Sequence, residues 1–267
     1  MKIAVCVKYV PVDSKVDVDP KTHALVRSSG AGEINPADRY AVEMARQLSE
    51  EDGVSFDVFT MGPDGAARAL KYAMALGAEK AVLLSDIVFA GSDTLGTAAV
   101  LAAALKKYGP YDLVLTGNAS NDGATGQVGP MLAQMLGVPD VTNAVEAETD
   151  GKTAILKKKD GNTLYTLKTA LPALASVPFG ANTPELPTLR HQVAANQREF
   201  DTVSAADLGL DPDTLGQAGA KSIVTDTVNV TAQKQGLEFI GSVDEKARDF
   251  ADTVDKIQQV IGGGKHA

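Results

Sequence analysis

Cysteine and histidine are scarce in this sequence of 267 residues. Cys6 is the single cysteine, so the chain cannot form a disulfide within itself. The three histidines, His23, His191 and His266, have no ligand-like spacing with Cys6, and we expect no metal ion held by the side chains. Cys6 lies in an apolar run, where a buried, inert thiol is expected rather than a reactive one.

Long hydrophobic runs and an excess of basic residues are also missing. No stretch approaches the roughly 18 apolar residues of a membrane span, so no membrane insertion is expected. The opening run at residues 3–7 lacks the basic region and cleavage site of a secretion signal, which favours the cytoplasm. The net charge of -9 and the isoelectric point near 4.9 disfavour a nucleic-acid partner, since such binding depends largely on basic side chains.

What is present is a regular alternation of strand-like and helix-like segments. Helical patterns separate runs rich in β-branched residues, at 3–7, 54–60, 81–84 and 113–115. Asn35 is predicted to cap the first helix, with Pro36 at its first position, and Ser92 to cap the third. A fourth helix is expected from about Gln127 to Gly137. This rhythm predicts an α/β fold with a doubly wound, mostly parallel sheet.

The pattern changes after residue 141. Stretches 154–156 and 164–167 alternate like a hairpin, which predicts an antiparallel addition to the sheet. From Pro178 the composition is typical of loops, and no long periodic pattern follows until about Asp244. We expect an extended arm here that ends in an amphipathic helix, packed either on its own core or on a partner.

The segment 117–130 is the most informative candidate for a ligand site. It follows an apolar strand, and ligands of open parallel sheets bind beyond the carboxyl ends of strands. Its glycines permit close backbone approach, and its polar side chains can hydrogen-bond sugar hydroxyls or base edges. The residues concerned are Gly117, Gly123, Gly126, Asp122, Thr125 and Gln127. The loop matches no standard phosphate-binding fingerprint, and a plain strand-to-helix connection is the alternative.

A second polar loop, at residues 91–97, places the Thr94 and Thr97 hydroxyls three residues apart at a predicted helix start. That spacing suits a phosphate, and ordinary helix capping explains it equally well. No nucleophile, base and acid can be assembled into a catalytic set, because His191 lies in a proline-rich loop and His266 in the tail. The sequence therefore indicates a protein that carries a ligand rather than one that hydrolyses it.

Four blocks along the chain share their order and spacing with one known family. They are the strand and loop at 5–11, the Asn-Pro-x-Asp helix start at 35–38, the segment 70–78, and the loop 117–130 with its Asp-(x)4-Gln spacing at Asp122 and Gln127. The sequence thereby resembles the β-subunits of electron-transfer flavoproteins from Met1 to the final helix. The resemblance implies an adenine-nucleotide α-hydrolase-like domain over residues 1–178. It also implies a docking loop, arm and helix over 179–267, with the helix packed on an α-subunit.

The resemblance also implies a cofactor site. In that family the β-site holds AMP in ordinary carriers or a second FAD in the electron-bifurcating type. Two features favour FAD here: segment 85–97 resembles the bifurcating group's Phe-x-Gly-x-Asp-Thr segment, and residues 127–130 have that group's Gln-Val-Gly-Pro form. The implied cofactor-binding residues are Cys6, Asn35, Asp38, Met61, Asp93, Thr94, Thr97, Gly117, Asn118, Asp122, Gly123, Thr125, Gly126, Gln127 and Val128.

The nucleotide loop departs from the bifurcating pattern, which generally begins Gly-Arg-Gln-Ala-Ile-Asp-Gly-Asp. Five of those residues are replaced, so a guanidinium and a carboxylate are missing; the replacements are Asn118, Ala119, Ser120, Asn121 and Ala124. Charge near a flavin tunes its redox behaviour, so the resemblance supports FAD binding more firmly than bifurcation.

The expected function is that of an electron-transfer subunit acting within a flavoprotein oxidoreductase complex. The resemblance implies a heterodimer whose α-subunit carries a second FAD, exchanging electrons with NADH, ferredoxin or flavodoxin, and a flavin dehydrogenase of the acyl-CoA or lactate type. Leu189 is expected to dock the dehydrogenase, with packing on its own core as the alternative. The alternatives for the whole chain are an AMP-holding carrier and a nucleotide-sensing stress-type module, which needs no partner. The long arm argues against the latter.

Overall fold

The computed structural model describes residues 1–12, 32–51, 53–225 and 237–262 of the chain, the last four without their side chains. One compact unit spans Met1–Asp226 and a second spans Thr227–Ala267. Part of the expected arm, at 226–236, lies outside the described residues, and so do His23 and His266.

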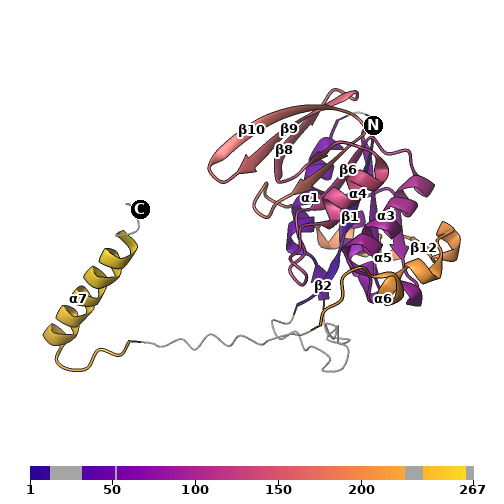
Figure 1. Ribbon diagram of the computed structural model, residues 1–267. Helices are drawn as coiled ribbons and strands as arrows, with labels where there is room; N and C mark the ends of the chain where they lie inside the picture. The colour runs from indigo at the N-terminus through magenta and orange to yellow at the C-terminus, as the bar shows by residue number, and fades with distance from the viewer. Residues whose placement is uncertain (13–31, 52, 226–236, 263–267) are drawn as a thin grey trace. The chain divides into compact units, whose positions relative to one another are not determined.

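A seven-stranded sheet forms the centre of the first unit (Figure 1). Its strand order is β12-β5-β4-β1-β6-β11-β7, and all six neighbouring pairs are parallel. The strands are β1 (Lys2–Val7), β4 (Ser55–Met61), β5 (Ala81–Leu84), β6 (Leu113–Gly117), β7 (Asp140–Val141), β11 (Ala173–Val177) and β12 (Asp201–Val203). The doubly wound parallel sheet expected from the sequence is confirmed.

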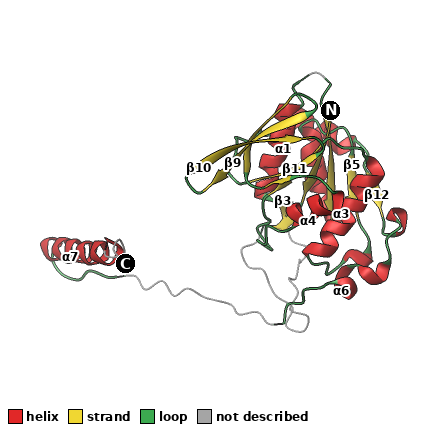
Figure 2. Cartoon of the chain, turned by 45° about the horizontal axis from the view of Figure 1, so that its top comes forward, coloured by secondary structure: helices red, strands yellow, loops and turns green. Residues whose placement is uncertain are grey.

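Four helices cover the two faces of this sheet (Figure 2). Side chains of α1 (Pro36–Leu48) and α2 (Ala67–Ala75) share one apolar core with the sheet, and those of α3 (Thr94–Tyr108) and α4 (Val128–Leu136) share the other. The chain runs from β1 outward through β4 to β5 and then returns to place β6 on the other side of β1. The sheet order therefore reverses between β1 and β6, which is where open α/β sheets bind ligands.

The run at residues 3–7 of β1 is apolar throughout because both faces of this strand are buried. Ile3, Val5 and Val7 belong to the core under α1 and α2, whereas Ala4 and Cys6 belong to the core under α3 and α4. Successive side chains of a strand point to opposite faces, and both faces here are covered by helices. The sequence therefore has to be apolar at every position rather than at every second one.

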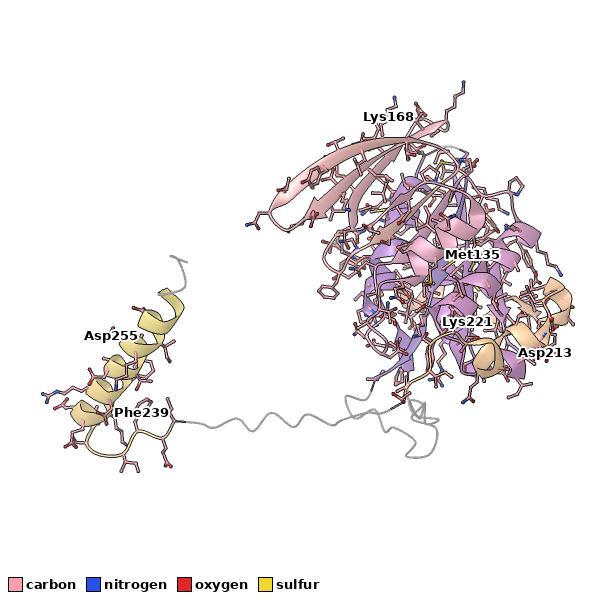
Figure 3. All side chains as sticks on the ribbon, viewed as in Figure 1. Met135, Lys168, Asp213, Lys221, Phe239 and Asp255 are labelled. Atoms are coloured by element: carbon pink, nitrogen blue, oxygen red, sulfur yellow. The ribbon has the colours of Figure 1, made fainter. Side chains whose placement is uncertain are left out.

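Antiparallel strands form a separate three-stranded sheet of order β10-β9-β8, made by β8 (Ala144–Thr149), β9 (Thr153–Asp160) and β10 (Thr163–Ala170). The predicted hairpin is present, with Gly161 at a φ of +56° in its turn. The hairpin belongs to this second sheet, and its strands do not pair with the edge strands of the seven-stranded sheet. Every residue of β10 except Thr169 is exposed, and Lys168 projects outward from this sheet (Figure 3). A short antiparallel ribbon joins β2 (Tyr9–Pro11) to β3 (Gly32–Ile34).

Residues after Pro178 contain more regular structure than their composition predicted. They form α5 (Leu189–Gln197), strand β12 and α6 (Gly216–Gly219). Single 3-10 turns lie at Ala206–Leu208 and Pro212–Thr214, and two more occur earlier in the chain, at Asp64–Ala66 and Ile87–Phe89. These elements are short, so they leave no long periodic pattern in the sequence. Strand β12 pairs with β5, and the compact unit therefore continues well beyond residue 178.

The second unit contains one long helix, α7 (Val243–Gly262). Ser242 and Glu245 form a reciprocal cap at its start, in which the Ser242 amide donates to Glu245 Oε2 at 2.8 Å. Phe250 packs edge-on against Phe239 with the ring centroids 5.9 Å apart. Phe250 and Ile257 nevertheless stay at least half exposed, so the described residues of the second unit do not by themselves cover the apolar face of α7.

Candidate nucleotide site

Asn35 joins the start of α1 to the loop that follows β6. Its side chain does not cap the helix as predicted. Instead Nδ2 donates to Asp38 Oδ1 and to the Ala119 carbonyl oxygen, each at 2.9 Å, and Oδ1 accepts from the Asn121 amide at 3.0 Å. The Asn35 amide donates to the Lys8 carbonyl oxygen at 2.8 Å. Through its backbone and its side chain together, this buried residue thus cross-links three segments at the carboxyl edge of the sheet.

Asp38 is the second element of this cross-link. Its buried carboxylate accepts a hydrogen bond from the Lys8 amide at 2.5 Å and another from the Gly117 backbone. Burial raises the pKa of Asp38 to about 7, against the opposing effect of these bonds and of Asn35. A methyl group at position 117 would lie 2.1 Å from Asp38 Oδ1, so the glycine is required by close approach rather than by its φ.

The loop between β6 and α4 has an anchored half and an exposed half. Residues 117–120 and Asp122 are at least partly buried, and the Asn118 amide donates to the Val177 carbonyl oxygen at 2.9 Å. Residues 123–127 are exposed, with Ala124 and Gly126 at φ values of 50° and 63°. The exposed half carries Gly123, Thr125 and Gln127, which the sequence predicts as ligand contacts, beside the start of α4 at Val128.

The second predicted loop meets the first. Thr94, the first residue of α3, donates its hydroxyl to Gln127 Oε1 at 3.1 Å. Thr97 lies one turn further along α3 and is partly buried. Residues separated by more than 30 positions therefore border one continuous surface, which extends from the glycine loop to the N-terminus of α3.

Asp93, rather than the predicted Ser92, caps α3. Its Oδ1 accepts from the Gly96 amide at 2.9 Å, whereas the Ser92 hydroxyl donates to the Phe89 carbonyl oxygen at 2.7 Å. The other oxygen, Oδ2, accepts from the amides of Lys221 and Ser222 at 2.8 and 3.1 Å. The prediction of a Ser92 cap is wrong because that hydroxyl closes the preceding turn. Through Oδ2, Asp93 also holds the segment at residues 221–222 against the start of α3.

Cys6 and Met61 lie at the ends of β1 and β4, beneath this surface. Cys6 is buried, as expected, and burial, with a smaller contribution from Asp38, raises its pKa to about 12, so the thiol stays protonated at neutral pH. Met61 is partly buried against the core under α3 and α4. The Thr60 and Thr116 hydroxyls are buried near the same strand ends and have no hydrogen-bond partner among the described residues.

Lys8 is a site residue that the sequence did not reveal, and it contacts Asp122 and Ser120 of the predicted loop. The Lys8 ammonium lies 2.6 Å from Asp122 Oδ1 and 3.3 Å from Ser120 Oγ. The one signal in the sequence was position, because Lys8 directly follows the first strand. Within the part of the chain described, no group of three or more metal-ligating side chains occurs, and no helix is long and apolar enough to cross a membrane.

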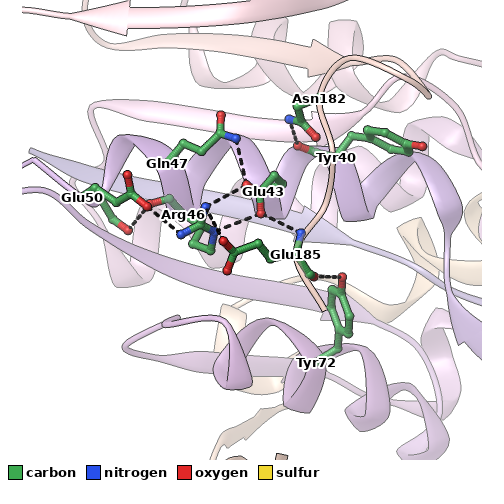
Figure 4. A network of polar contacts seen from close by, with 9 residues as sticks. Tyr40, Glu43, Arg46, Gln47, Glu50, Tyr72, Asn182 and Glu185 are labelled. Carbon is green, nitrogen blue, oxygen red and sulfur yellow. Dashed lines mark hydrogen bonds and ion pairs between the residues drawn. The ribbon is translucent and has the colours of Figure 1, made fainter. Parts of the chain in front are cut away.

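Leu189 lies apart from these loops, as the first residue of α5, and its side chain is 77% exposed. Hydrogen bonds hold the segment before α5 against α1 and α2 (Figure 4). Asn182 donates to the Tyr40 carbonyl oxygen at 3.0 Å, and the Glu185 amide donates to Glu43 Oε2 at 3.2 Å. The helix that presents Leu189 is therefore supported by the body of the molecule.

The family model for the electron transfer flavoprotein domain matches residues 22–208. The electron transfer flavoprotein subunit beta of Thermoanaerobacterium thermosaccharolyticum is 35% identical over 255 residues, which cover 94% of this chain and 97% of that protein. This chain belongs to the family of electron transfer flavoprotein β-subunits. The family resemblance drawn from the sequence is thereby confirmed, and electron transfer is the function of the family.

Two further relatives carry other names. The caffeyl-CoA reductase-Etf complex subunit CarD of Acetobacterium woodii is 36% identical, over 91% of this β-subunit and 93% of that protein. Protein FixA of Bradyrhizobium diazoefficiens is 32% identical, over 94% of this β-subunit and 90% of that protein. Both similarities span the nucleotide loops and the α5 segment.

Proposed function

We propose that this β-subunit binds FAD at the carboxyl edge of its parallel sheet and transfers electrons within a cytoplasmic heterodimer. The α-subunit would carry a second FAD, and electrons would pass between NADH, ferredoxin or flavodoxin, and a flavin dehydrogenase of the acyl-CoA or lactate type. The residues proposed to hold the β-site FAD border the surface between β1, β6 and α3. Those proposed for the adenosine part are Asn118, Gly123, Thr125, Gly126, Gln127 and Val128, in the loop that Asp122 anchors, and those for the remainder are Thr94 and Thr97.

The contact between Thr94 and Gln127 is the observation that carries the proposal. It makes the glycine loop and the N-terminus of α3 one surface, with the two side chains 3.1 Å apart. AMP needs the glycine loop alone, whereas FAD adds a second phosphate, a ribityl chain and the isoalloxazine ring. Amides at a helix N-terminus favour anions, and the α3 start supplies two threonine hydroxyls beside them. FAD, the longer ligand, would therefore contact both the glycine loop and the N-terminus of α3.

The side chains present fit such a ligand. The exposed run 123–127 offers backbone amides and small residues, and the buried Thr116 hydroxyl at the end of β6 has no partner among the described residues. When bound, FAD supplies reversible electron transfer, while the protein holds it and sets its potential. Cys6 would stay neutral beneath the site, because burial raises its pKa to about 12.

Electron bifurcation is the finer part of the proposal, and Asn118 is the residue that bears on it. The bifurcating pattern has an arginine at this position. Here the side-chain nitrogen Nδ2 of Asn118 donates to Asn143 Oδ1 at 3.2 Å, and the contact is neutral. Loss of a positive charge near a flavin lowers the flavin's reduction potential, since the reduced, anionic form loses a stabilising charge. Asn118→Arg is therefore expected to raise the potential of the β-site flavin.

Cofactor content tests the proposal. The purified heterodimer is denatured, and the released nucleotides are separated and quantified. Two FAD per αβ pair are expected. One FAD with one AMP would replace the proposal by its alternative, a carrier in which the β-subunit holds AMP as a structural ligand. A β-subunit that is monodisperse and nucleotide-loaded without any α-subunit would instead favour a stand-alone nucleotide-binding module.

A further inference from the structure

Lys8 is fixed in place by the start of α1. Its amide donates to Asp38 Oδ2 at 2.5 Å, and its carbonyl oxygen accepts from the Asn35 amide at 2.8 Å. Both polar groups of its backbone are thus used by the Asn-Pro-x-Asp helix start. The side chain is left to reach across the end of β1 toward β6, the strand beside β1 in the sheet.

Asp122 lies in the loop after β6, toward which Lys8 reaches, and its buried carboxylate is stabilised by a nearby cation. Its side chain is only 3% exposed, and a carboxylate so far removed from water is costly unless a charged partner compensates it. The Lys8 ammonium lies 2.6 Å from Asp122 Oδ1 and also reaches Ser120 Oγ at 3.3 Å. The ammonium itself is 37% exposed, so the lysine spans from solvent to the buried carboxylate.

Asp122 is also the last partly buried residue before the exposed run 123–127 of its loop. Asn35 fixes Ala119 and Asn121 through their backbone groups, and Lys8 fixes Asp122 through its side chain. Beyond this point residues 123–127 are all exposed and two of them, Ala124 and Gly126, have positive φ. The ion pair therefore sets where the exposed half of the loop begins.

We propose that Lys8 is a positioning residue of the nucleotide site: by holding Asp122, it fixes the loop 123–127 in the conformation that receives the adenosine part of the ligand. This inference rests on the proposed function, because it presupposes a nucleotide at this loop. It assigns Asp122 a role through the loop backbone, in place of the direct hydrogen bond to the nucleotide expected from the sequence. Preorganised loops bind more tightly because less conformational entropy is lost on binding.

A matched control exists at the opposite end of the same strand. Lys2 forms an ion pair with Asp57 at 2.8 Å, and the exposed fractions of the two side chains are 32% and 1%. Both pairs thus join a lysine of the β1 region, about one third exposed, to an aspartate whose side chain is buried. Lys2 lies at the amino end of β1, away from the nucleotide loops. Lys2→Met therefore removes an equivalent pair without touching the site.

Titration of the αβ heterodimer, depleted of β-site nucleotide, with adenosine, AMP and FAD tests the inference. Lys8→Met is expected to weaken all three by a common factor of ~10 or more, the size typical of losing a charge-assisted hydrogen bond. Lys2→Met should leave all three unchanged, and Lys8→Arg should restore most of the affinity. A loss confined to AMP and FAD, with adenosine binding intact, would show instead that Lys8 contacts phosphate and would overturn the positioning role.

A double-mutant cycle and hydrogen exchange complete the test. If Lys8 acts through Asp122, Lys8→Met combined with Asp122→Asn should weaken binding no more than either change alone. Amides of residues 118–127 should lose protection in both single variants before any nucleotide is added. Multiplicative losses, or unchanged protection, would overturn the inference. Wild-type protein that takes up AMP but no FAD would overturn the proposed FAD function while leaving this test valid with AMP.

Discussion

Lys71 and Arg198 each close the carboxyl end of the other's helix. Lys71, in α2, donates to the carbonyl oxygens of Ala195 and Asn196 at the end of α5, at 3.0 and 3.4 Å, and also to that of Arg198. Arg198 in turn donates to the Ala78 carbonyl oxygen at 2.8 Å, just beyond α2, and to that of Glu79. Cations are favourable at helix C-termini, where carbonyl groups are left unpaired. The exchange fixes the short helix that carries Leu189.

Removing the first of these cations should loosen α5. Lys71→Met removes one donor from each of three carbonyl oxygens, and we expect the free energy of unfolding to fall by ~1–2 kcal/mol. Urea denaturation measures the loss, and hydrogen exchange should locate it in residues 189–198. Lys106→Met serves as the control, because Lys106 donates to one carbonyl oxygen, that of Met135, at 3.0 Å. An equal effect of both changes would contradict the special role of the reciprocal pair.

Leu189→Ala should slow electron transfer to the dehydrogenase without altering the fold. A 77% exposed leucine contributes little to the core, whereas truncation of an apolar interface anchor can cost ~2 kcal/mol or more of binding. We expect normal flavin content, an unchanged thermal midpoint and a raised KM for the dehydrogenase. Leu164→Ala is the matched control, since Leu164 is 55% exposed in β10, outside the nucleotide loops and α5. A lowered midpoint with an unchanged transfer rate per folded molecule would contradict docking.

The buried Asp38 should make stability depend on pH. Its pKa is raised to about 7 in the folded protein, above the ordinary value of 3.8, so the folded state holds this proton more tightly than the unfolded chain does. The stabilising contribution is full below about pH 4 and is lost as the pH rises through 7. The difference in free energy of unfolding between wild type and Asp38→Asn should fall by roughly 1.4 kcal/mol per pH unit across this window.

Urea denaturation of both proteins from pH 5 to pH 8 measures that slope. The constant offset between them reports the hydrogen bonds that asparagine cannot make, and only the slope reports the proton. A difference independent of pH would show that the carboxylate stays ionised throughout, stabilised by Asn35, the Lys8 amide and the Gly117 backbone.

Gly117→Ala should damage the site, whereas Gly123→Ala in the same loop should not. The added methyl group would lie 2.1 Å from Asp38 Oδ1 in the first case, and its nearest neighbour would be Ser120 Oγ at 3.4 Å in the second. Overpacking of this kind costs typically 1–3 kcal/mol of stability. Gly117→Ala is expected to lower both the thermal midpoint and nucleotide affinity. Similar behaviour of the two variants would mean that Asp38 moves aside without cost.

Local signals in the sequence correctly located the ends of helices that flank the sheet. The Asn35-Pro36 start of α1 and the Gly137 end of α4 agree with the structure, because both depend on the backbone preferences of single residues. The Ser92 cap was misplaced by one residue, since two neighbouring capping side chains compete there and only the tertiary contacts of Asp93 decide between them.

Long-range relationships were not readable in the same way. Lys8 and Asp122 are separated by 114 positions, and neither residue type nor spacing identifies the pair. The sequence marked Asp122 and Gln127 as polar groups in a loop, but not that one is buried in an ion pair while the other meets Thr94. Strand β12 was missed for a related reason: three residues gain their extended form from pairing with β5 and carry no pattern of their own.

The position of β12 gives the chain beyond residue 178 a protective role. All four residues of β5 are buried and apolar, and β12 occupies the side of β5 that would otherwise be the rim of the sheet. A protein cut after β11 would expose a strand with unpaired amides and carbonyls, a template for pairing with other chains. Shortened versions of this subunit should therefore aggregate through β5, even though the nucleotide loops precede the cut.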